Sequence, residues 1–205
     1  MSHDDAAPDA APDDAPDDAP GGTPVGVPDG EEIAAFWELA RGRAGLGRLA
    51  AVVGTGARAS LPPPAWALGD TAEEADAQLA RVLARTRTAM TTALWELADA
   101  DVAPPERGDL SIVVDGRGHP RALIRTTAVR QVRFADVDAE HAAAEGEGDG
   151  SLEAWRARYA GRLAQAAAVA GRVLDDDTSV VLEQFEVRFP TRPAAAPAVR
   201  EPALS

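Results

Sequence analysis

Three kinds of side chain in this sequence have the chemistry to bind or transform a ligand: arginine, a histidine–glutamate pair and tryptophan. Arg87 is a permanent cation whose planar guanidinium suits a phosphate, a carboxylate or the edge of a base. His141 and Glu145 are four positions apart and share one face if their segment is helical. Such a pair can relay a proton, or it can be a surface hydrogen bond or a helix cap. Trp66 and Trp95 are candidates for stacking on unpaired bases.

Further arginines alternate along one predicted strand. Arg121, Arg125 and Arg133 fall on the same side of residues 121–134, where they can follow a phosphate backbone. The alternative is a solvated strand face whose arginines pair with nearby acids. All 20 basic residues are arginine, and the chain contains no lysine.

The number and spacing of cysteines and histidines limit the kinds of reactive and metal-binding sites that the chain can form. The absence of cysteine excludes disulfides, thiolate metal sites and cysteine nucleophiles. The three histidines, His3, His119 and His141, share no ligand spacing. We therefore expect neither a metal nor another cofactor.

Hydrophobic periodicity and cap signals predict the elements that must position these side chains. In chain order we expect a helix capped by Asp29, a helix from Thr71 to Leu83, a strand-prone segment 88–97, a hairpin of strands 110–114 and 121–134, helices 136–145 and 151–173, and a strand 180–189. Trp37 and Trp155 lie on apolar helix stripes and are expected in the core. Mixed strands and helices with short connections indicate an α+β domain built on a small, partly closed sheet.

The two ends of the chain differ from its middle. Residues 1–30 repeat an Ala-Pro-Asp-Asp theme, and 190–205 are rich in Pro and Ala, so both should be disordered. The formal net charge is −14, but residues 1–32 carry ten acidic and no basic side chains. Residues 1–30 form an acidic arm with two possible roles. It either acts through its charge, as an electrostatic decoy or a solubilising segment, or it is a tolerated low-complexity extension. The folded part can still present a local basic face.

Membrane and export signals are missing from the sequence. No stretch of about 18 apolar residues occurs, so we expect no membrane span. The acidic N-terminus is the opposite of a signal peptide, which predicts a cytoplasmic protein.

Several blocks, in a fixed order over residues 31–189, resemble the ASCH-domain family, specifically its YhfF-like subgroup. They are Trp66-Ala67-Leu68-Gly69-Asp70-Thr71, Gly108-Asp109-Leu110-Ser111-Ile112-Val113-Val114-Asp115-Gly116, Ile124-Arg125-Thr126-Thr127, Glu140-His141-Ala142-Ala143-Ala144-Glu145-Gly146-Glu147-Gly148-Asp149 and Ser151-Leu152-Glu153-Ala154-Trp155-Arg156. The resemblance implies a PUA-like β-barrel flanked by helices, with a cleft between sheet and helices and a link to RNA or nucleosides.

Some members of that family are amidohydrolases that deacetylate N4-acetylcytidine, and others are reported as ribonucleases. In the amidohydrolases a Gly-x-Lys-Thr-x-Thr segment supplies a lysine and a threonine nucleophile, and a glutamate in a His-x-x-x-Glu segment assists. Here Arg85 replaces the glycine, Arg87 the lysine and Met90 the nucleophilic threonine, whereas Glu145 is retained. Arginine is no general base near neutrality, and methionine is no nucleophile.

From the residues and the resemblance together, we predict a binding domain at 31–189 whose cleft holds RNA, a nucleotide or a nucleoside. The expected ligand-binding residues are Arg87, Thr88, Arg125, Trp66 and His141. The alternative is an N4-acetylcytidine-type amidohydrolase or a ribonuclease, with Glu145 and Arg87 as its catalytic residues. A third class, a protein-interaction domain, rests on the acidic arm alone.

Overall fold

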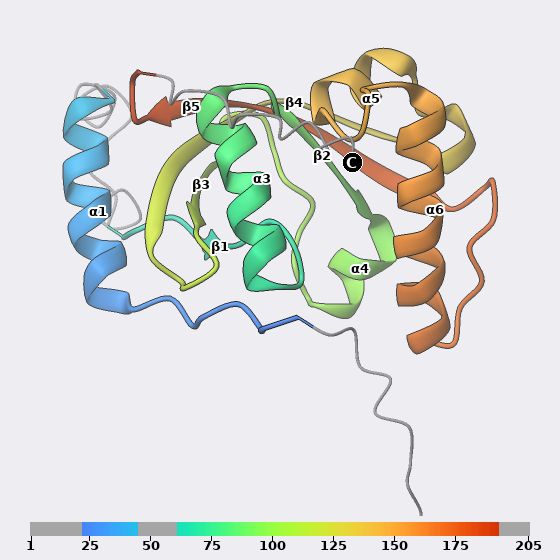
Figure 1. The fold of residues 1–205 in the computed structure, drawn as a ribbon, viewed down its shortest axis with the longest axis horizontal. Helices are drawn as coiled ribbons and strands as arrows, with labels where there is room; N and C mark the ends of the chain where they lie inside the picture. Colours follow the sequence, from blue (N-terminus) through green and yellow to red (C-terminus); the bar gives the residue numbers. More distant parts are fainter. Residues whose placement is uncertain (1–21, 45–60, 193–205) are drawn as a thin grey trace, which may run out of the picture.

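The computed structural model describes residues 22–44 and 61–192. Within these residues, five α-helices flank one five-stranded sheet (Figure 1). In chain order the elements are α1 (Gly30–Arg43), β1 (Ala65–Trp66), α3 (Ala72–Ala84), β2 (Ala89–Ala93), α4 (Leu94–Asp99), β3 (Leu110–Val114), β4 (Pro120–Arg133), the 3-10 turn η3 (Phe134–Asp136), α5 (Ala139–Glu145), α6 (Leu152–Val169) and β5 (Ser179–Phe189).

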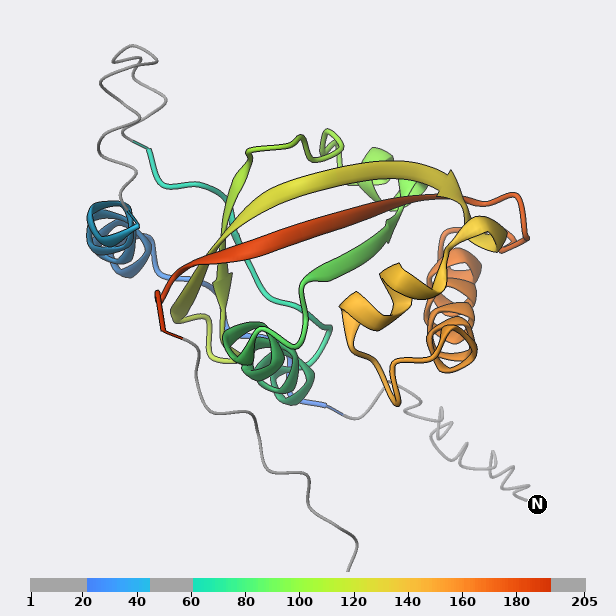
Figure 2. The same cartoon turned by 90° about the horizontal axis from the view of Figure 1, so that it is seen from above.

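The strand order of the sheet is β1-β3-β4-β5-β2. The short β1 runs parallel to β3, and all other neighbours are antiparallel. The two longest strands, β4 and β5, curve together across the molecule (Figure 2). The predicted α+β class with a small mixed sheet flanked by helices is confirmed. The sheet does not close into the expected β-barrel, because within the described residues its edge strands β1 and β2 do not pair with each other.

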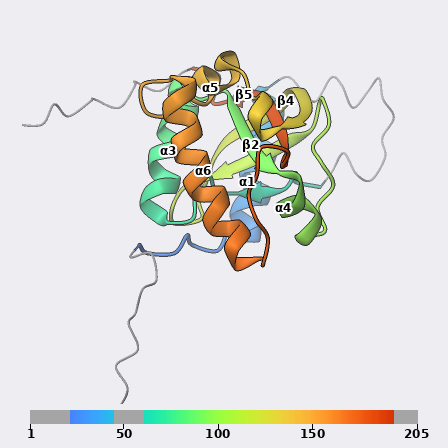
Figure 3. The same cartoon turned by 90° about the vertical axis from the view of Figure 1, so that its right-hand side faces the viewer.

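The helices cover different parts of this sheet. Helices α3 and α5 lie on the same side of the β4–β5 ribbon, with α1 at one end and α6 at the other (Figures 2 and 3). Three clusters of buried apolar side chains join the helices to the strands. Trp37 is in the cluster under α1 and Trp155 in the cluster under α5 and α6, which confirms both as core residues.

Side-chain caps fix where the helices begin. Asp29 accepts hydrogen bonds from two backbone N–H groups at the start of α1, and Thr71 and Ser151 each accept one at α3 and α6, as predicted. Asp138 caps α5 in the same way through the His141 N–H. These caps fix where α3, α5 and α6, which contribute to the site described below, begin.

The structure differs from the predicted elements in segment 88–97 and at the end of α6, among other places. The strand-prone segment 88–97 divides into β2 and α4, because the Glu96 carboxylate accepts a hydrogen bond from the Ala93 N–H at 2.8 Å and starts a helix there. Helix α6 ends at Val169 rather than 173, just before Gly171, whose φ is +65°. Val173, the last residue of the predicted helix, is 86% exposed.

The structure describes part of both ends that we expect to be disordered, namely residues 22–30 and 190–192. Residues 22–29 lie along the domain, where Pro24 forms a bridge with Thr71 and the Gly26 N–H donates to the Gly116 carbonyl at 3.0 Å. Residues 1–21 and 193–205, which make up the rest of the arm and tail, lie outside the described residues. In the described part of the chain, no helix is long and apolar enough to cross a membrane.

Candidate functional site

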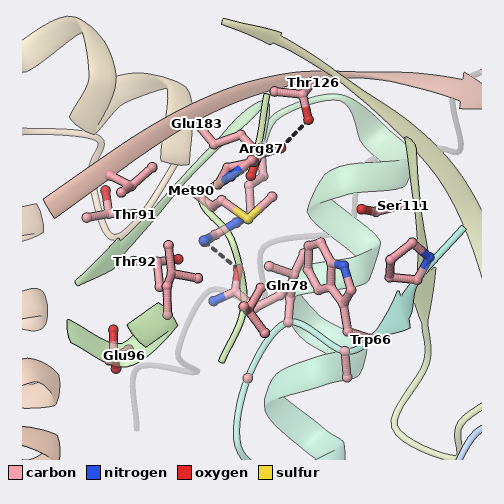
Figure 4. A pocket seen from close by; sticks show the side chains of 18 of the residues that line it. Trp66, Gln78, Arg87, Met90, Thr91, Thr92, Glu96, Ser111, Thr126 and Glu183 are labelled. Carbon is pink, nitrogen blue, oxygen red and sulfur yellow. Dashed lines mark hydrogen bonds between the residues drawn. The ribbon is translucent and has the colours of Figure 1, made fainter. Parts of the chain in front are cut away.

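A pocket of about 870 Å³ lies between the sheet and helices α3, α4 and α6. All five strands contribute to its wall, among them β1 through Trp66, β2 through Met90, β3 through Ser111, β4 through Thr126 and β5 through Glu183 (Figure 4). A cavity of this size falls in the usual range for small-molecule sites, about 300–1,000 Å³. The pocket is therefore roomy enough for a nucleoside-sized ligand.

Arg87 lines this pocket from the segment between α3 and β2, and it is only 5% exposed. Its Nη1 donates to the Gln78 side-chain oxygen at 3.0 Å and to Glu147 Oε1 at 2.6 Å. Its Nη2 donates to Glu145 Oε2 at 3.3 Å. The guanidinium is thus held by two carboxylates and one amide, and the Arg87–Gln78 bond is visible in Figure 4.

Glu145, at the end of α5, is fully buried behind Arg87. Its Oε1 accepts from the Thr91 hydroxyl at 2.5 Å and lies 3.1 Å from His141 Nε2. Its Oε2 accepts from Arg87 and from the Tyr159 hydroxyl. Since a carboxylate offers about four acceptor positions, these four donors use the whole capacity of Glu145.

Glu147 forms a second buried carboxylate two residues further along the chain. Its Oε1 accepts from the Gln78 amide at 2.8 Å and from Arg87. Its Oε2 accepts from Arg81 at 3.0 Å and pairs with Arg158 at 3.3 Å. Glu147 therefore ties α3 and α6 to the segment that follows α5.

The hydrogen-bond network also fixes the role of His141, which is completely buried. Its Nε2 lies 2.9 Å from the Thr91 hydroxyl oxygen as well as 3.1 Å from Glu145 Oε1. A carboxylate can only accept, so Nε2 must carry a hydrogen and act as a donor. His141 Nε2 therefore donates to Glu145, while its Nδ1 is buried and has no hydrogen-bond partner among the described residues.

Charge and hydrogen bonding keep both buried glutamates ionised. Burial by itself would raise the pKa of the Glu145 carboxyl, but the His141 hydrogen bond and the Arg87 charge outweigh burial and lower it. Burial would likewise raise the pKa of Glu147, but Gln78 and Arg87 lower it. Burial raises the pKa of Tyr159, so its hydroxyl stays protonated and donates to Glu145.

Met90 and Thr91 are consecutive in β2, and both line the pocket. The Thr91 hydroxyl is engaged by Glu145, and the Met90 thioether lies in the pocket near Arg87 (Figure 4). Where the resemblance expects a nucleophilic threonine, this chain therefore presents an apolar surface.

The structure brings three of the predicted site residues together: Arg87, Glu145 and His141 belong to one buried network. Trp66 lies in the pocket wall near Ser111 (Figure 4). Thr88 and Arg125 are half-buried and are not among the residues that line the pocket. The Thr88 hydroxyl lies 3.5 Å from the Ala144 carbonyl.

The predicted arginine stripe on β4 is largely engaged in ion pairs. Arg121 lies 3.7 Å from Asp115, and Arg133 pairs with Asp136 and Asp177. These pairs favour the alternative of a solvated strand face over a phosphate track.

Sequence reasoning did not single out several residues of the network, chiefly Gln78, Glu147 and Tyr159. Gln78 falls on the buried stripe of α3 with Ala75, Leu79 and Val82, and a polar residue at that spacing was the available signal. Tyr159 lies four residues after Trp155 and so falls on the same apolar stripe, and a buried tyrosine hydroxyl needs a partner. Glu147 lies between two glycines outside any periodic element, so no pattern marks it.

Metal binding finds no support in the same region. Within residues 22–44 and 61–192, no three His, Asp or Glu side chains gather closely enough to hold a metal ion.

Two solved structures have a similar fold. An ASCH domain from Lactobacillus crispatus JV V101 has 21% identity and a TM-score of 0.61, and the match covers 77% of this chain and 94% of that one. A protein from Enterococcus faecalis V583 has 24% identity and a TM-score of 0.61, with 77% and 88% covered. At these identities the likeness shows the fold alone. No curated protein matches the chain.

The ASCH-domain family model matches residues 64–188. This range includes β1 to β4, all of β5 except its last residue, and the whole buried network. This match spans more than half of the 205 residues. The chain belongs to the ASCH-domain family.

Proposed function

We propose that this chain binds a nucleoside, or an unpaired base of RNA, in the pocket between the sheet and the helices. The base and sugar, rather than a phosphate, supply the recognition. The family's general link to RNA supports the ligand class, and Trp66 supplies an aromatic wall on which a base can stack. The observation that carries the proposal is that each arginine in the pocket wall is already engaged by a carboxylate.

The pairing of these arginines is extensive. Arg87 is bound by Glu145 and Glu147, and Arg158 lies 2.5 Å from Glu74. Arg162 lies 3.1 Å from Glu96. A phosphate would have to displace these carboxylates, and in the buried pairs that would leave a negative charge without its partner. A ligand without a phosphate avoids this cost.

Hydrogen-bonding capacity remains at Arg87. Its Nε–H is buried and has no acceptor among the described residues, although the side chain lines the pocket. Such an unsatisfied donor is costly unless a water or a ligand supplies the acceptor. The carbonyl group of a base, reached by a small shift of Arg87, would be that acceptor.

Calorimetric titration with the four ribonucleosides and their 5′-monophosphates tests this proposal. We expect at least one nucleoside to bind, with its monophosphate binding no more tightly. Because no phosphate is contacted, the Kd should change by less than about twofold between 50 and 300 mM salt. Tighter binding of the monophosphate that weakens steeply with salt would overturn the phosphate-free site, and no binding of any nucleoside would overturn the function.

A pair of tryptophan variants localises the binding. Trp66→Leu removes the aromatic wall but keeps an apolar side chain, and we expect affinity to fall about tenfold because base stacking is lost. Trp95→Leu is the matched control, since Trp95 is also partly buried but lies outside the pocket, beneath Arg172. Equal loss in both variants, with unchanged melting temperatures, would contradict stacking on Trp66.

One observation favours an enzyme as the second candidate: Thr91 lines the pocket with its hydroxyl 2.5 Å from a carboxylate. However, Glu145 has a lowered pKa and no free acceptor position, which makes it a poor general base. We therefore expect no product from N4-acetylcytidine or a short unpaired RNA, resolved by mass. Product from the wild type that disappears in Glu145→Gln would establish an enzyme instead.

A further inference from the structure

The wall of the pocket carries more acids than bases. Six carboxylates and three arginines line it. The arginines are engaged as described above, but three of the carboxylates, on Asp70, Asp109 and Glu183, have no arginine partner among the described residues. Asp70 and Asp109 are exposed to solvent, whereas Glu183 is half-buried. Of these three unpaired carboxylates, Glu183 is therefore the one whose charge is least screened by water.

Glu183 is held in a defined position on β5. Its Oε1 accepts from the Thr126 hydroxyl at 2.5 Å, a bond drawn in Figure 4. The Thr126 backbone is itself fixed, since its N–H donates to the Asp109 carbonyl and its carbonyl accepts from Gly108, both at 2.9 Å. Glu183 Oε2 has no hydrogen-bond partner in the described part of the chain and remains available to a ligand.

The surroundings of Glu183 are apolar on its other sides. Met90 is its cross-strand partner on β2, and Val181 precedes it on the same side of β5; both line the pocket. Burial raises the pKa of the Glu183 carboxyl; the Thr126 hydrogen bond offsets part of that rise, and the charge of Asp109 adds to it. The ionised carboxylate thus lacks a compensating charge in the free protein.

We propose that the pocket selects a nucleoside whose base carries a positive charge, such as a base alkylated on a ring nitrogen, and that Glu183 is the residue that selects it. This inference rests on the proposed nucleoside function and narrows its ligand class. A neutral amino group gives Glu183 one hydrogen bond, whereas a cationic base adds a charge interaction in a half-buried site where screening is weak. The Met90 thioether provides an apolar surface for the plane of the same base.

Isomeric nucleosides separate charge from size. At pH 7, 1-methyladenosine is a cation and N6-methyladenosine is neutral, yet the two differ only in the position of one methyl group and in the proton that carries the charge. The pair 3-methylcytidine and 5-methylcytidine differs in the same way. We expect the cationic isomer of at least one pair to bind about tenfold more tightly in calorimetric titration of the full chain.

Two variants then assign the effect. Glu183→Gln keeps the side-chain shape and an acceptor for Thr126, and it should reduce the preference for the cation to within about twofold. Glu186→Gln is the matched control, because Glu186 lies on the same strand but is exposed, pairs with Arg188 and does not line the pocket. It should leave the preference unchanged.

The outcomes distinguish the two proposals. Equal affinity for both isomers, or a preference that survives in Glu183→Gln, would overturn the cationic ligand while leaving nucleoside binding intact. Failure of all nucleosides to bind would overturn the proposed function itself. Because the isomer comparison uses the unaltered protein, it remains decisive even if the Glu183 variant does not fold.

Discussion

At the scale of single residues, the buried network of Arg87, Glu145 and Glu147 behaves as a scaffold for the pocket rather than as a set of reactive groups. Glu145 receives donors from four different side chains, and Arg87 is bound at both terminal nitrogens. A carboxylate whose acceptor positions are all occupied, as in Glu145, cannot also move a proton to a substrate without breaking a bond. The positions available to a ligand are those that face the pocket with hydrogen-bonding capacity to spare, of which Glu183 is the clearest.

Removing the charge of Glu145 tests this scaffold role through stability. Glu145→Gln places an amide N–H₂ among donors and leaves Arg87 with one carboxylate fewer, so we expect a loss of about 3 kcal/mol in the free energy of unfolding. Glu140→Gln, on the exposed side of the same helix, should cost less than about 0.5 kcal/mol. Chemical denaturation measures both. A cost for Glu145→Gln no larger than that of its control would show that the network does not hold the fold together.

The same substitution should alter the pH dependence of stability. The pKa of Glu145 in the folded protein is below its ordinary value of 4.5, so the ionised form stabilises the fold above that pH. This contribution is lost as the pH falls below about 4.5 and the carboxyl is protonated. We expect the decline of unfolding free energy between pH 5 and 3 to be shallower in Glu145→Gln than in the wild type. Parallel curves would contradict the lowered pKa.

Single residues also show what the sequence could and could not predict about the site. Residue type, helical spacing and the family resemblance point to Arg87, Glu145 and His141, and the structure places these three side chains in one hydrogen-bond network. Glu183 and Thr126 were not selected, because their pairing depends on the register of β4 against β5, shifted by an irregularity between Thr126 and Ala128. Alternation along one strand cannot reveal such a cross-strand contact.

At the scale of elements, the turn after α5 determines where both buried glutamates lie. Gly146 ends the helix with φ of +65°, between Glu145 and Glu147. A Cβ at this position would lie 2.6 Å from the Thr86 carbonyl oxygen, next to the segment that carries Arg87. The glycine thus allows α5 to approach the loop after α3, and this approach closes the network.

A matched pair of glycines tests that approach. Gly171 has the same φ of +65°, but a Cβ there would meet nothing within 4 Å. Gly171→Ala should therefore cost only backbone strain, about 1 kcal/mol. Gly146→Ala adds the clash with Thr86, so we expect a clearly larger loss of stability and weaker nucleoside binding. Thermal melting and titration measure both effects, and equal losses in the two variants would refute the close approach.

Helices and strands could be predicted where a local sequence pattern was sufficient to define them. The caps at Asp29, Thr71 and Ser151 and the apolar stripes that follow them located three helices. The two-residue β1 was not predictable, because it exists only through its parallel pairing with β3. The sequence of α4 resembles a strand because Thr91 and Thr92, just before it, favour β structure. The residue whose side chain starts the helix, Glu96, lies three positions after Ala93 and is not a conventional cap.

At the scale of the whole molecule, net charge opposes the binding of a polyanion. The formal charge is −14, and residues 1–21 contribute seven aspartates and no basic residue. Repulsion of this kind acts over about a Debye length, roughly 10 Å at 0.1 M salt, and disappears at high salt. It affects a phosphodiester chain but not an uncharged nucleoside. The arm and the pocket should therefore be separable by choice of ligand.

Deletion of residues 1–21 would halve the formal net charge, and a chain with the seven aspartates changed to asparagine would do so at constant length. For a short unpaired RNA, we expect both variants to bind about three- to tenfold more tightly than the wild type at 50 mM salt, with no difference at 500 mM. The Kd of a neutral nucleoside should be the same in all three proteins, because the pocket is complete without these residues. If the arm acts through its charge, deletion and neutralisation should strengthen RNA binding equally. If deletion strengthens RNA binding but neutralisation does not, the arm acts through its bulk, and if neither does, its charge has no part in excluding RNA.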